Sequence, residues 1–266
     1  LGRTITAAAL LSAMLKPDSE QSLLVKIEGS GPIREIHAQA DARGNIRGYA
    51  ANPQPDLAED IGTLSFSRTI GAGFLTVRRD IGMKEPYTSV IPLHVGEVAG
   101  DLAYYLTVSE QIPSAVIIGL TLGQDGSIQS SGGILIQTFP GTPEAAIARV
   151  EENISSMNLS LGESLREGAD IMGVVKGLFN NEAVTVLDSR PIRPSCRCDR
   201  RAIRLMLASL NREDLQEMID KDGGAEVTCT FCSRQYHFDK KELERILDSK
   251  GPSSPAGPGA SKPEMH

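Results

Sequence analysis

Four cysteines constrain this chain more than any other feature. They form two close pairs, Cys196-Arg-Cys198 and Cys229-Thr-Phe-Cys232, and the 266 residues contain no further cysteine. Two short thiol clusters joined by a longer stretch of chain can close a tetrahedral four-sulfur site around zinc. The region that holds them must therefore fold so that both pairs meet. Ordinary zinc ribbons seldom use the Cys-X-Cys spacing of the first pair.

The composition sets broad limits on the rest of the chain. Its length suffices for one large domain and a smaller one, and 40% hydrophobic with 23% charged residues is ordinary for a globular protein. The net charge of −7 argues against a general affinity for nucleic acid or anionic membranes. No apolar run reaches the length that spans a bilayer, so we expect no membrane partner.

Residues 1–141 combine helical and strand-like patterns. The apolar stretch 7–15 is expected to be an amphipathic or buried helix rather than the core of a signal peptide, because Lys16, Pro17 and Asp18 follow it. The remaining expected elements are strands at 23–28, 35–40, 45–50, 73–78, 116–122 and 134–139 and a helix at 98–109. Strands and helices do not alternate regularly, so we predict an α+β domain.

A helical linker with a hinge is expected at 142–195. Thr142 would be the N-cap of its first helix and Pro143 the first helical residue. Asn, Ser and Gly recur through this stretch and disfavour helix, so its helices need a neighbour to stay folded. Pro191 and Pro194 would make a stiff hinge before the first cysteine.

Residues 196–248 are expected to form a compact module around the cysteines. Asp199 and Asn211 would each cap a helix, and Asp239 begins a capping box that opens the last helix. The expected elements are helices at 200–210 and 212–221, a hairpin at 225–238 with the second cysteine pair at its turn, and a helix from 240 to 247. The tail 249–266 is rich in Gly, Pro and Ser and is expected to be disordered.

We predict one zinc ion per chain, bound in the reduced state by Cys196, Cys198, Cys229 and Cys232. A permanent structural zinc that nucleates the module is the simplest interpretation. Unrelated free thiols would not gather every cysteine in one short stretch, and extracellular disulfides would require an export signal. His237 could replace one sulfur, but four thiolates already complete the coordination shell.

The same site also suits a redox sensor. Zinc holds its ligands as thiolates, the reactive form of cysteine, and four arginines within 197–204 add positive charge. Peroxide or hypochlorous acid oxidises such sulfurs, and a neighbouring thiol then forms a disulfide, which removes zinc ligands. Structural zinc contributes on the order of 10–16 kcal/mol to a small domain. A module of this size has only about 3–8 kcal/mol of stability, so it should unfold without the metal.

The motifs Cys196-X-Cys198 and Cys229-X-X-Cys232 at this separation are highly specific. Other characteristic stretches of the first domain are Gly31-Pro32, Asp41–Tyr49, Glu97–Tyr105, Ser109–Pro113 and Gly132-Gly133. Together these motifs closely resemble the heat-shock protein 33 family, the redox-regulated holdase chaperones of bacteria and organelles. The similarity runs from Leu1 to about Leu247, and family members normally carry an additional N-terminal segment before the position of Leu1.

The resemblance implies an α+β N-terminal domain, a helical linker and a C-terminal zinc domain. It implies that the reduced, zinc-bound chain is inactive and usually monomeric. Oxidation would form the disulfides Cys196–Cys198 and Cys229–Cys232, release zinc and unfold the linker. The active form would dimerise and hold unfolding client proteins without ATP. The implied location is the bacterial cytoplasm, or an organelle stroma or matrix.

Two other classes of function compete with this interpretation. A zinc-containing nucleic-acid-binding or regulatory protein could use the arginines between Arg200 and Arg204, although the overall negative charge weakens that reading. An enzyme is disfavoured, because zinc bound by four thiolates has no open position for a substrate.

Overall fold

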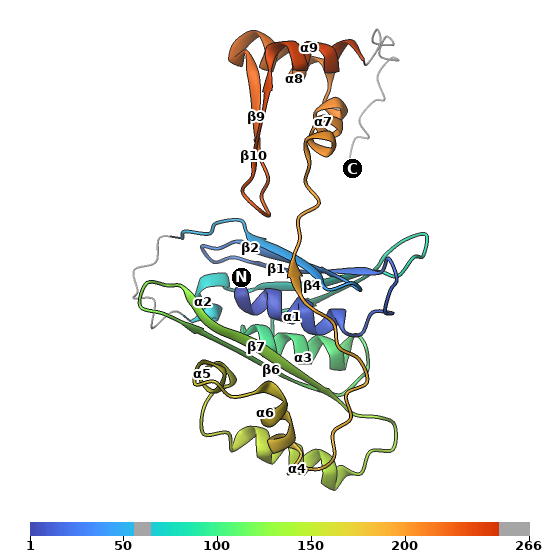
Figure 1. The fold of residues 1–266 in the computed structure, drawn as a ribbon, viewed down its shortest axis with the longest axis vertical. Helices are drawn as coiled ribbons and strands as arrows, with labels where there is room; N and C mark the ends of the chain where they lie inside the picture. Colours follow the sequence, from blue (N-terminus) through green and yellow to red (C-terminus); the bar gives the residue numbers. More distant parts are fainter. Residues whose placement is uncertain (56–64, 250–266) are drawn as a thin grey trace, which may run out of the picture. The chain divides into compact units, whose positions relative to one another are not determined.

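The computed structural model describes residues 1–55 and 65–249. Within them the chain divides into two compact units, Leu1–Ser195 and a second that begins at Cys196 (Figure 1). The predicted disordered tail lies, from residue 250, outside the described residues. Each unit has its own hydrophobic core.

A six-stranded sheet in the order β5-β4-β1-β2-β3-β8 forms one layer of the first unit. Its strands are β1 (Ser22–Gly29), β2 (Glu35–Asp41), β3 (Asn45–Ala50), β4 (Gly73–Asp80), β5 (Tyr87–Pro92) and β8 (Arg193–Pro194). Buried and half-buried residues alternate along β1 and β2, as expected for a sheet with one face on a core. The short helix α2 (Phe66–Ile70) precedes β4.

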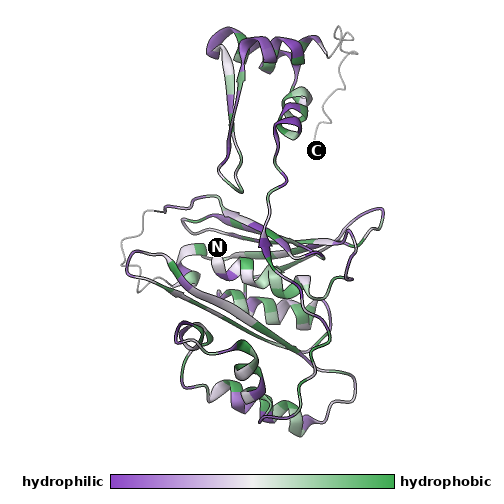
Figure 2. Cartoon of the chain, viewed as in Figure 1, coloured by the Kyte–Doolittle hydropathy of each residue, from purple (hydrophilic) through white to green (hydrophobic). Residues whose placement is uncertain are grey.

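Two helices cover the inner face of this sheet. They are α1 (Gly2–Ser12) and α3 (Val98–Val108), and both bury small and aliphatic side chains in the main core. Tyr105 is the largest of the fully buried side chains. Figure 2 shows the hydrophobic residues of α1 and α3 lying among the strands.

The hairpin of β6 (Ser114–Leu122) and β7 (Ile128–Gln137) lies on the other side of these helices (Figure 1). Successive residues point to opposite faces, so Val116 and Ile118 join the main core while Ile117 packs into a smaller one. Burial on both faces explains why the sequence shows a continuous apolar run here.

Three helices pack on the outer face of the hairpin. They are α4 (Glu144–Ser155), α5 (Leu161–Arg166) and α6 (Ile171–Leu178), and Leu161 and Leu178 are buried with Ile134 in the smaller core. The backbone of α5 comes so close that a Cβ atom on Gly119 would lie 2.1 Å from the Gly162 nitrogen. The neighbour that these helices need is thus the β6–β7 hairpin.

The structure corrects several boundaries. Pro143, with ψ at 135°, is the N-cap of α4, because the Thr142 hydroxyl is used in a turn with the backbone of Phe139. Strand β7 begins six residues earlier than predicted and ends at Gln137, and β5 was not predicted at all. The expected hinge is partly strand, since Arg193–Pro194 pairs in parallel with Asn45–Ile46.

The second unit contains three α-helices, one π-helical turn and one hairpin between Cys196 and Ser249. They are α7 (Arg200–Ser209), α8 (Arg212–Glu217), the π-helix η2 (Met218–Asp222), β9 (Gly224–Thr228), β10 (Gln235–Asp239) and α9 (Lys240–Asp248). The helix expected at 212–221 therefore ends as an α-helix at Glu217 and continues as η2. Asp199, Asn211 and Asp239 all cap helices through their side chains, as predicted.

Candidate metal centre

A tight turn between β9 and β10 presents the second cysteine pair. The Cys229 N–H donates to the Arg234 carbonyl at 2.9 Å, and the Ser233 N–H donates to the Cys229 carbonyl at 2.8 Å. Ser233 has a φ of 56°, the left-handed conformation that closes such a turn. Cys229 and Cys232 consequently lie on one side of the turn, where both sulfurs face the first cysteine pair.

The first pair lies immediately before α7. The Asp199 carboxylate accepts a hydrogen bond of 2.7 Å from the Ala202 N–H, which fixes the start of the helix two residues after Cys198. On the other side, the Ser195 N–H donates to the Ile46 carbonyl at 2.9 Å.

The structure brings the four predicted cysteines together. Their sulfur atoms all lie within 4.8 Å of one another. The individual separations are 3.3 Å for Cys196–Cys198, 3.6 Å for Cys196–Cys229 and 3.3 Å for Cys198–Cys232. Four thiolates around tetrahedral zinc would be about 3.8 Å apart, given a Zn–S distance of about 2.3 Å. The donor set and its spacing therefore fit a zinc ion.

The predicted histidine alternative does not join this cluster. The His237 side chain is exposed, and its Nδ1 lies 3.4 Å from a carboxylate oxygen of Glu226 on the neighbouring strand. His37 and His94 belong to the first unit, where they stack on Tyr49 and Tyr104. Among the described residues, the four cysteines are the group whose ligand atoms converge.

Hydrogen bonds within the cluster shift the pKa values of Cys196 and Cys198 in opposite directions. Burial opposes ionisation of Cys196, but hydrogen bonds from the Cys198 backbone and from the other three thiols outweigh it and lower its pKa to about 6. A hydrogen bond from Tyr236 favours the Cys198 thiolate, yet its contacts with Cys232 and the remaining sulfurs, together with burial, raise its pKa to about 12. The surroundings thus favour the thiolate at Cys196 over that at Cys198.

A small hydrophobic core supports the site from behind. It is built from α7, α8, η2, β10 and α9, and its buried residues are Leu207, Leu215, Ile219, Tyr236, Phe238, Leu243, Ile246 and Leu247. Cys198 packs against this core. A core of eight side chains is small, so metal ligation would supply much of the order of the unit.

Arg200 does not extend from the surface as a free cation. Its guanidinium contacts both carboxylate oxygens of Glu242 at 2.7 and 2.8 Å, donates to the His237 carbonyl and lies 4.5 Å from the centre of the Phe238 ring. This bidentate pair joins α7 to α9 and holds the pKa of the Glu242 carboxyl below its usual value. Its role in the fold weakens the case for a nucleic-acid-binding arginine cluster.

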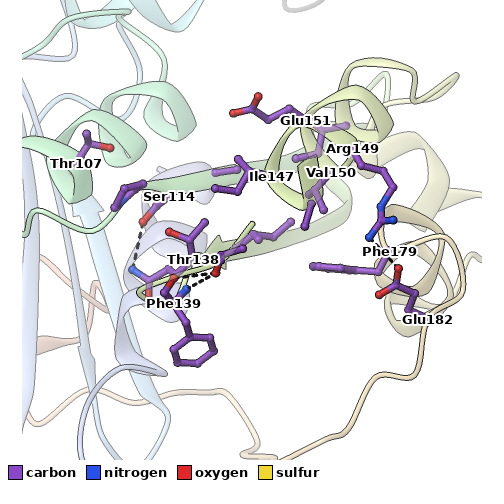
Figure 3. A pocket seen from close by; sticks show the side chains of 17 residues that line it. Thr107, Ser114, Thr138, Phe139, Ile147, Arg149, Val150, Glu151, Phe179 and Glu182 are labelled. Carbon is purple, nitrogen blue, oxygen red and sulfur yellow. Dashed lines mark hydrogen bonds and ion pairs between the residues drawn. The ribbon is translucent and has the colours of Figure 1, made fainter. Parts of the chain in front are cut away.

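The sequence did not predict a cavity of about 640 Å³ in the first unit (Figure 3). Ile147, Val150 and Ile154 of α4 line it together with Phe179, and none of the α4 side chains is fully buried. Figure 3 shows the ring of Phe139 pointing away from the cavity, and this residue is 84% exposed. The apolar face of α4 thus borders this cavity, and only Ile154 of the three also packs against the smaller core.

Known proteins are similar to this chain over most of its length. The family model for the Hsp33 protein matches residues 1–239. The chain belongs to the Hsp33 family. A 33 kDa chaperonin from Geobacter sulfurreducens is 43% identical over 250 residues, which cover 94% of this chain and 82% of the relative. One from Geobacillus kaustophilus is 40% identical over 248 residues, covering 92% and 83%.

A solved structure supports the Hsp33 assignment. The 33 kDa chaperonin (heat shock protein 33 homolog) of Thermotoga maritima matches with a TM-score of 0.85 at 36% identity, over 94% of this chain and 84% of that protein. The predicted fold class, an α+β domain followed by helices and a small cysteine-bearing domain, is confirmed. Among the described residues, no helix is both long and apolar enough to cross a membrane.

Membership in the Hsp33 family settles the broad class of function. The chain is a redox-regulated chaperone, and the nucleic-acid-binding alternative is not favoured. Hsp33 proteins are chaperones and not, in general, enzymes. As a chaperone, the chain binds client proteins.

Proposed function

We propose that this Hsp33 chain holds unfolding proteins without ATP and that its four cysteines switch this activity on when they are oxidised. The convergence of the four sulfurs within 4.8 Å carries the proposal, because neighbouring thiolates can report an oxidant by forming disulfides. The chaperonin names of the relatives from Geobacter sulfurreducens and Geobacillus kaustophilus support the client-holding role.

In the reduced state, Cys196, Cys198, Cys229 and Cys232 would hold one zinc ion per chain. Bound zinc would keep the four sulfurs as thiolates, the form that reacts with oxidants. The β9–β10 turn and the capped start of α7 orient the two pairs toward each other before the metal arrives. His237, exposed and beside Glu226, would stay outside the ligand set.

Oxidation by peroxide would proceed by two displacements. One thiolate attacks a peroxide oxygen, the O–O bond breaks, hydroxide leaves, and the sulfur becomes a sulfenic acid. A second thiolate then attacks that sulfur and displaces hydroxide, so that two electrons pass from two cysteines to one peroxide. We propose the pairings Cys196–Cys198 and Cys229–Cys232, in line with the sequence resemblance. The measured separations also include 3.3 Å between Cys198 and Cys232, so distance alone does not select the pairs.

Disulfide formation would unfold the second unit. A region of this size has about 3–8 kcal/mol of stability from its residues, whereas zinc contributes on the order of 10–16 kcal/mol to small domains. The chain carries the change onward, because Ser195, next to Cys196, is hydrogen-bonded to Ile46 at the sheet edge. Loss of order at Cys196 would loosen β8 and the segment that leads back to α6.

The helices α4, α5 and α6 would respond to that loosening. They are short, and much of the apolar face of α4 borders a cavity, so little free energy opposes their opening. Their departure would expose Ile117, Ile134 and Ile136 on the outer face of the hairpin. We propose that this apolar surface, together with the apolar side chains of the opened helices, binds clients.

We further propose that the oxidised chain forms a homodimer and acts in the cytoplasm. The newly exposed apolar surface would favour self-association as well as client binding. The relatives named above come from bacteria, which supports the proposed location.

The direct test is an aggregation assay with a thermally unfolding client. Protein oxidised with peroxide at elevated temperature should suppress light scattering without ATP, whereas reduced, zinc-loaded protein should not. Zinc release and thiol loss, measured on the same samples, should run in parallel with the gain of activity. Absence of suppression in both states would refute the proposal.

Replacing the second cysteine pair tests the ligand assignment. The double variant Cys229→Ser, Cys232→Ser leaves two sulfurs, so zinc stoichiometry should fall well below one per chain and the second unit should lose order. Thr230→Ser, in the same turn but exposed and without a sulfur, is the matched control. Unchanged zinc content in the double variant would show that the ligands lie elsewhere.

A further inference from the structure

Tyr236 connects the hydrophobic core of the second unit to the sulfur cluster. Its side chain is part of β10, only 7% exposed, and its ring packs among the aliphatic residues of the core. Its hydroxyl donates a hydrogen bond of 3.3 Å to the Cys198 sulfur. Because the ring is held by packing, the hydroxyl has little freedom to move away from that sulfur.

Arg234 determines which way this hydroxyl points. The Arg234 guanidinium, two positions before Tyr236, interacts with the Tyr236 hydroxyl. A guanidinium has donors and no acceptor. The Tyr236 oxygen must therefore accept from Arg234, which leaves its own proton for the Cys198 sulfur.

We propose that Tyr236 is a positioning residue that slows the reaction of the Cys198 sulfur with electrophiles and oxidants. A thiolate attacks through a lone pair, and a hydrogen bond to the sulfur withdraws electron density from it. Cys198 receives this hydroxyl donor in addition to its contacts with the other sulfurs. The inference rests on the proposed function, since it concerns thiolates of the same site.

The consequence is an ordered response. In the proposed Cys196–Cys198 pair, the first attack on an oxidant falls to Cys196, and Cys198 enters as the second thiolate, which displaces hydroxide from the Cys196 sulfenic acid. The two sulfurs are 3.3 Å apart, close enough for that second step. Tyr236 thereby protects one sulfur until another has been oxidised.

Alkylation rates at individual cysteines test this inference. Reduced, zinc-loaded full-length protein is treated with limiting iodoacetamide, and each cysteine is followed by peptide mass spectrometry. Tyr236→Phe keeps the ring and removes the hydroxyl, so Cys198 should react about fivefold faster, because one ordinary hydrogen bond changes a rate by about that factor. The rates of the other three cysteines should be unchanged. Tyr87→Phe, on exposed β5, is the matched control and should leave every rate unchanged.

A pair of substitutions at exposed Arg234 provides a second test that leaves the core intact. Arg234→Met frees the hydroxyl to rotate, so Cys198 should react faster than in wild type but slower than in Tyr236→Phe. Arg234→Lys, whose ammonium also only donates, should restore the wild-type rate. An unchanged Cys198 rate in Tyr236→Phe, or an equal rise at all four cysteines, would overturn the inference. The client assay is independent of these rates, so failure of the proposed function would be seen there alone.

Discussion

Gly44 is the residue that allows β8 to reach the sheet edge. Its φ is +79°, and its carbonyl accepts a hydrogen bond of 2.9 Å from the Arg193 N–H. A Cβ atom at this position would lie 2.2 Å from the Pro191 carbonyl oxygen. Both the backbone conformation and the close approach therefore require glycine.

Gly44→Ala should destabilise the first unit and release residues 191–195 from β3. The left-handed conformation alone costs about 1–2 kcal/mol for a residue with a Cβ atom, and the contact with Pro191 adds to it. Urea unfolding would measure the loss, and amide exchange at Arg193 and Ser195 would locate it.

Gly82→Ala is the matched control for this substitution. Gly82 has a similar φ of +84°, but no atom lies within 4 Å of its added Cβ. It should show the conformational cost without faster exchange at Arg193. Equal losses of stability, with unchanged protection of residues 193 and 195, would contradict the role of Gly44.

At the scale of single helices, two capping boxes hold the starts of α5 and α9. Ser160 and Glu163 form the first, and Asp239 and Glu242 form the second. The Ser160 hydroxyl and N–H lower the pKa of Glu163, while the Arg200 guanidinium and then the Asp239 N–H lower that of Glu242. Each carboxylate thus prefers its charged form in the folded chain.

Acid should weaken both helix starts. A pKa that is lower in the folded chain than in the unfolded one stabilises the fold above the ordinary glutamate value, about 4.3. That contribution disappears as the pH falls through the folded pKa. Amide exchange in α9 should accelerate below about pH 4, and Glu242→Gln should remove much of this pH dependence. Exposed Glu244→Gln is the control; an identical pH profile in both variants would contradict the assignment.

Filling the cavity beneath α4 should delay activation. Ala146 lines the cavity and Ala148 is exposed, so Ala146→Leu should gain about 0.5–2 kcal/mol while Ala148→Leu should not. Because opening of α4 is part of the proposed switch, Ala146→Leu should require more peroxide or a higher temperature to suppress client aggregation. Identical activation of both variants would show that α4 does not limit the response.

At the scale of the whole molecule, metal removal should unfold one unit and spare the other. The two units have separate hydrophobic cores, one around α1 and α3 and one behind the cysteines. A chelator under reducing conditions should make residues from Cys196 onward sensitive to protease, while α1 and α3 keep their slow amide exchange. Loss of protection in α1 and α3 at the same time would show that the units fold as one.

The sequence alone determined the local features of this Hsp33 chain. Alternating side chains predicted β1 to β4, cap residues such as Asp199 and Asp239 predicted helix starts, and the cysteine spacing predicted a four-sulfur cluster. The strand and helix-cap patterns each span only a few residues, so propensity, period and turn chemistry suffice to predict those elements.

Only the tertiary structure decided how distant segments meet. The pairing of Arg193 with the β3 edge, the packing of α4 to α6 on the β6–β7 hairpin, and the cavity beneath α4 depend on contacts between remote parts of the chain. The Tyr236 hydroxyl likewise acquires its partner Cys198 only after β10 and the first cysteine pair come together. Such contacts depend on how side chains from distant segments pack together, and a pattern of neighbouring residues in the sequence does not predict them.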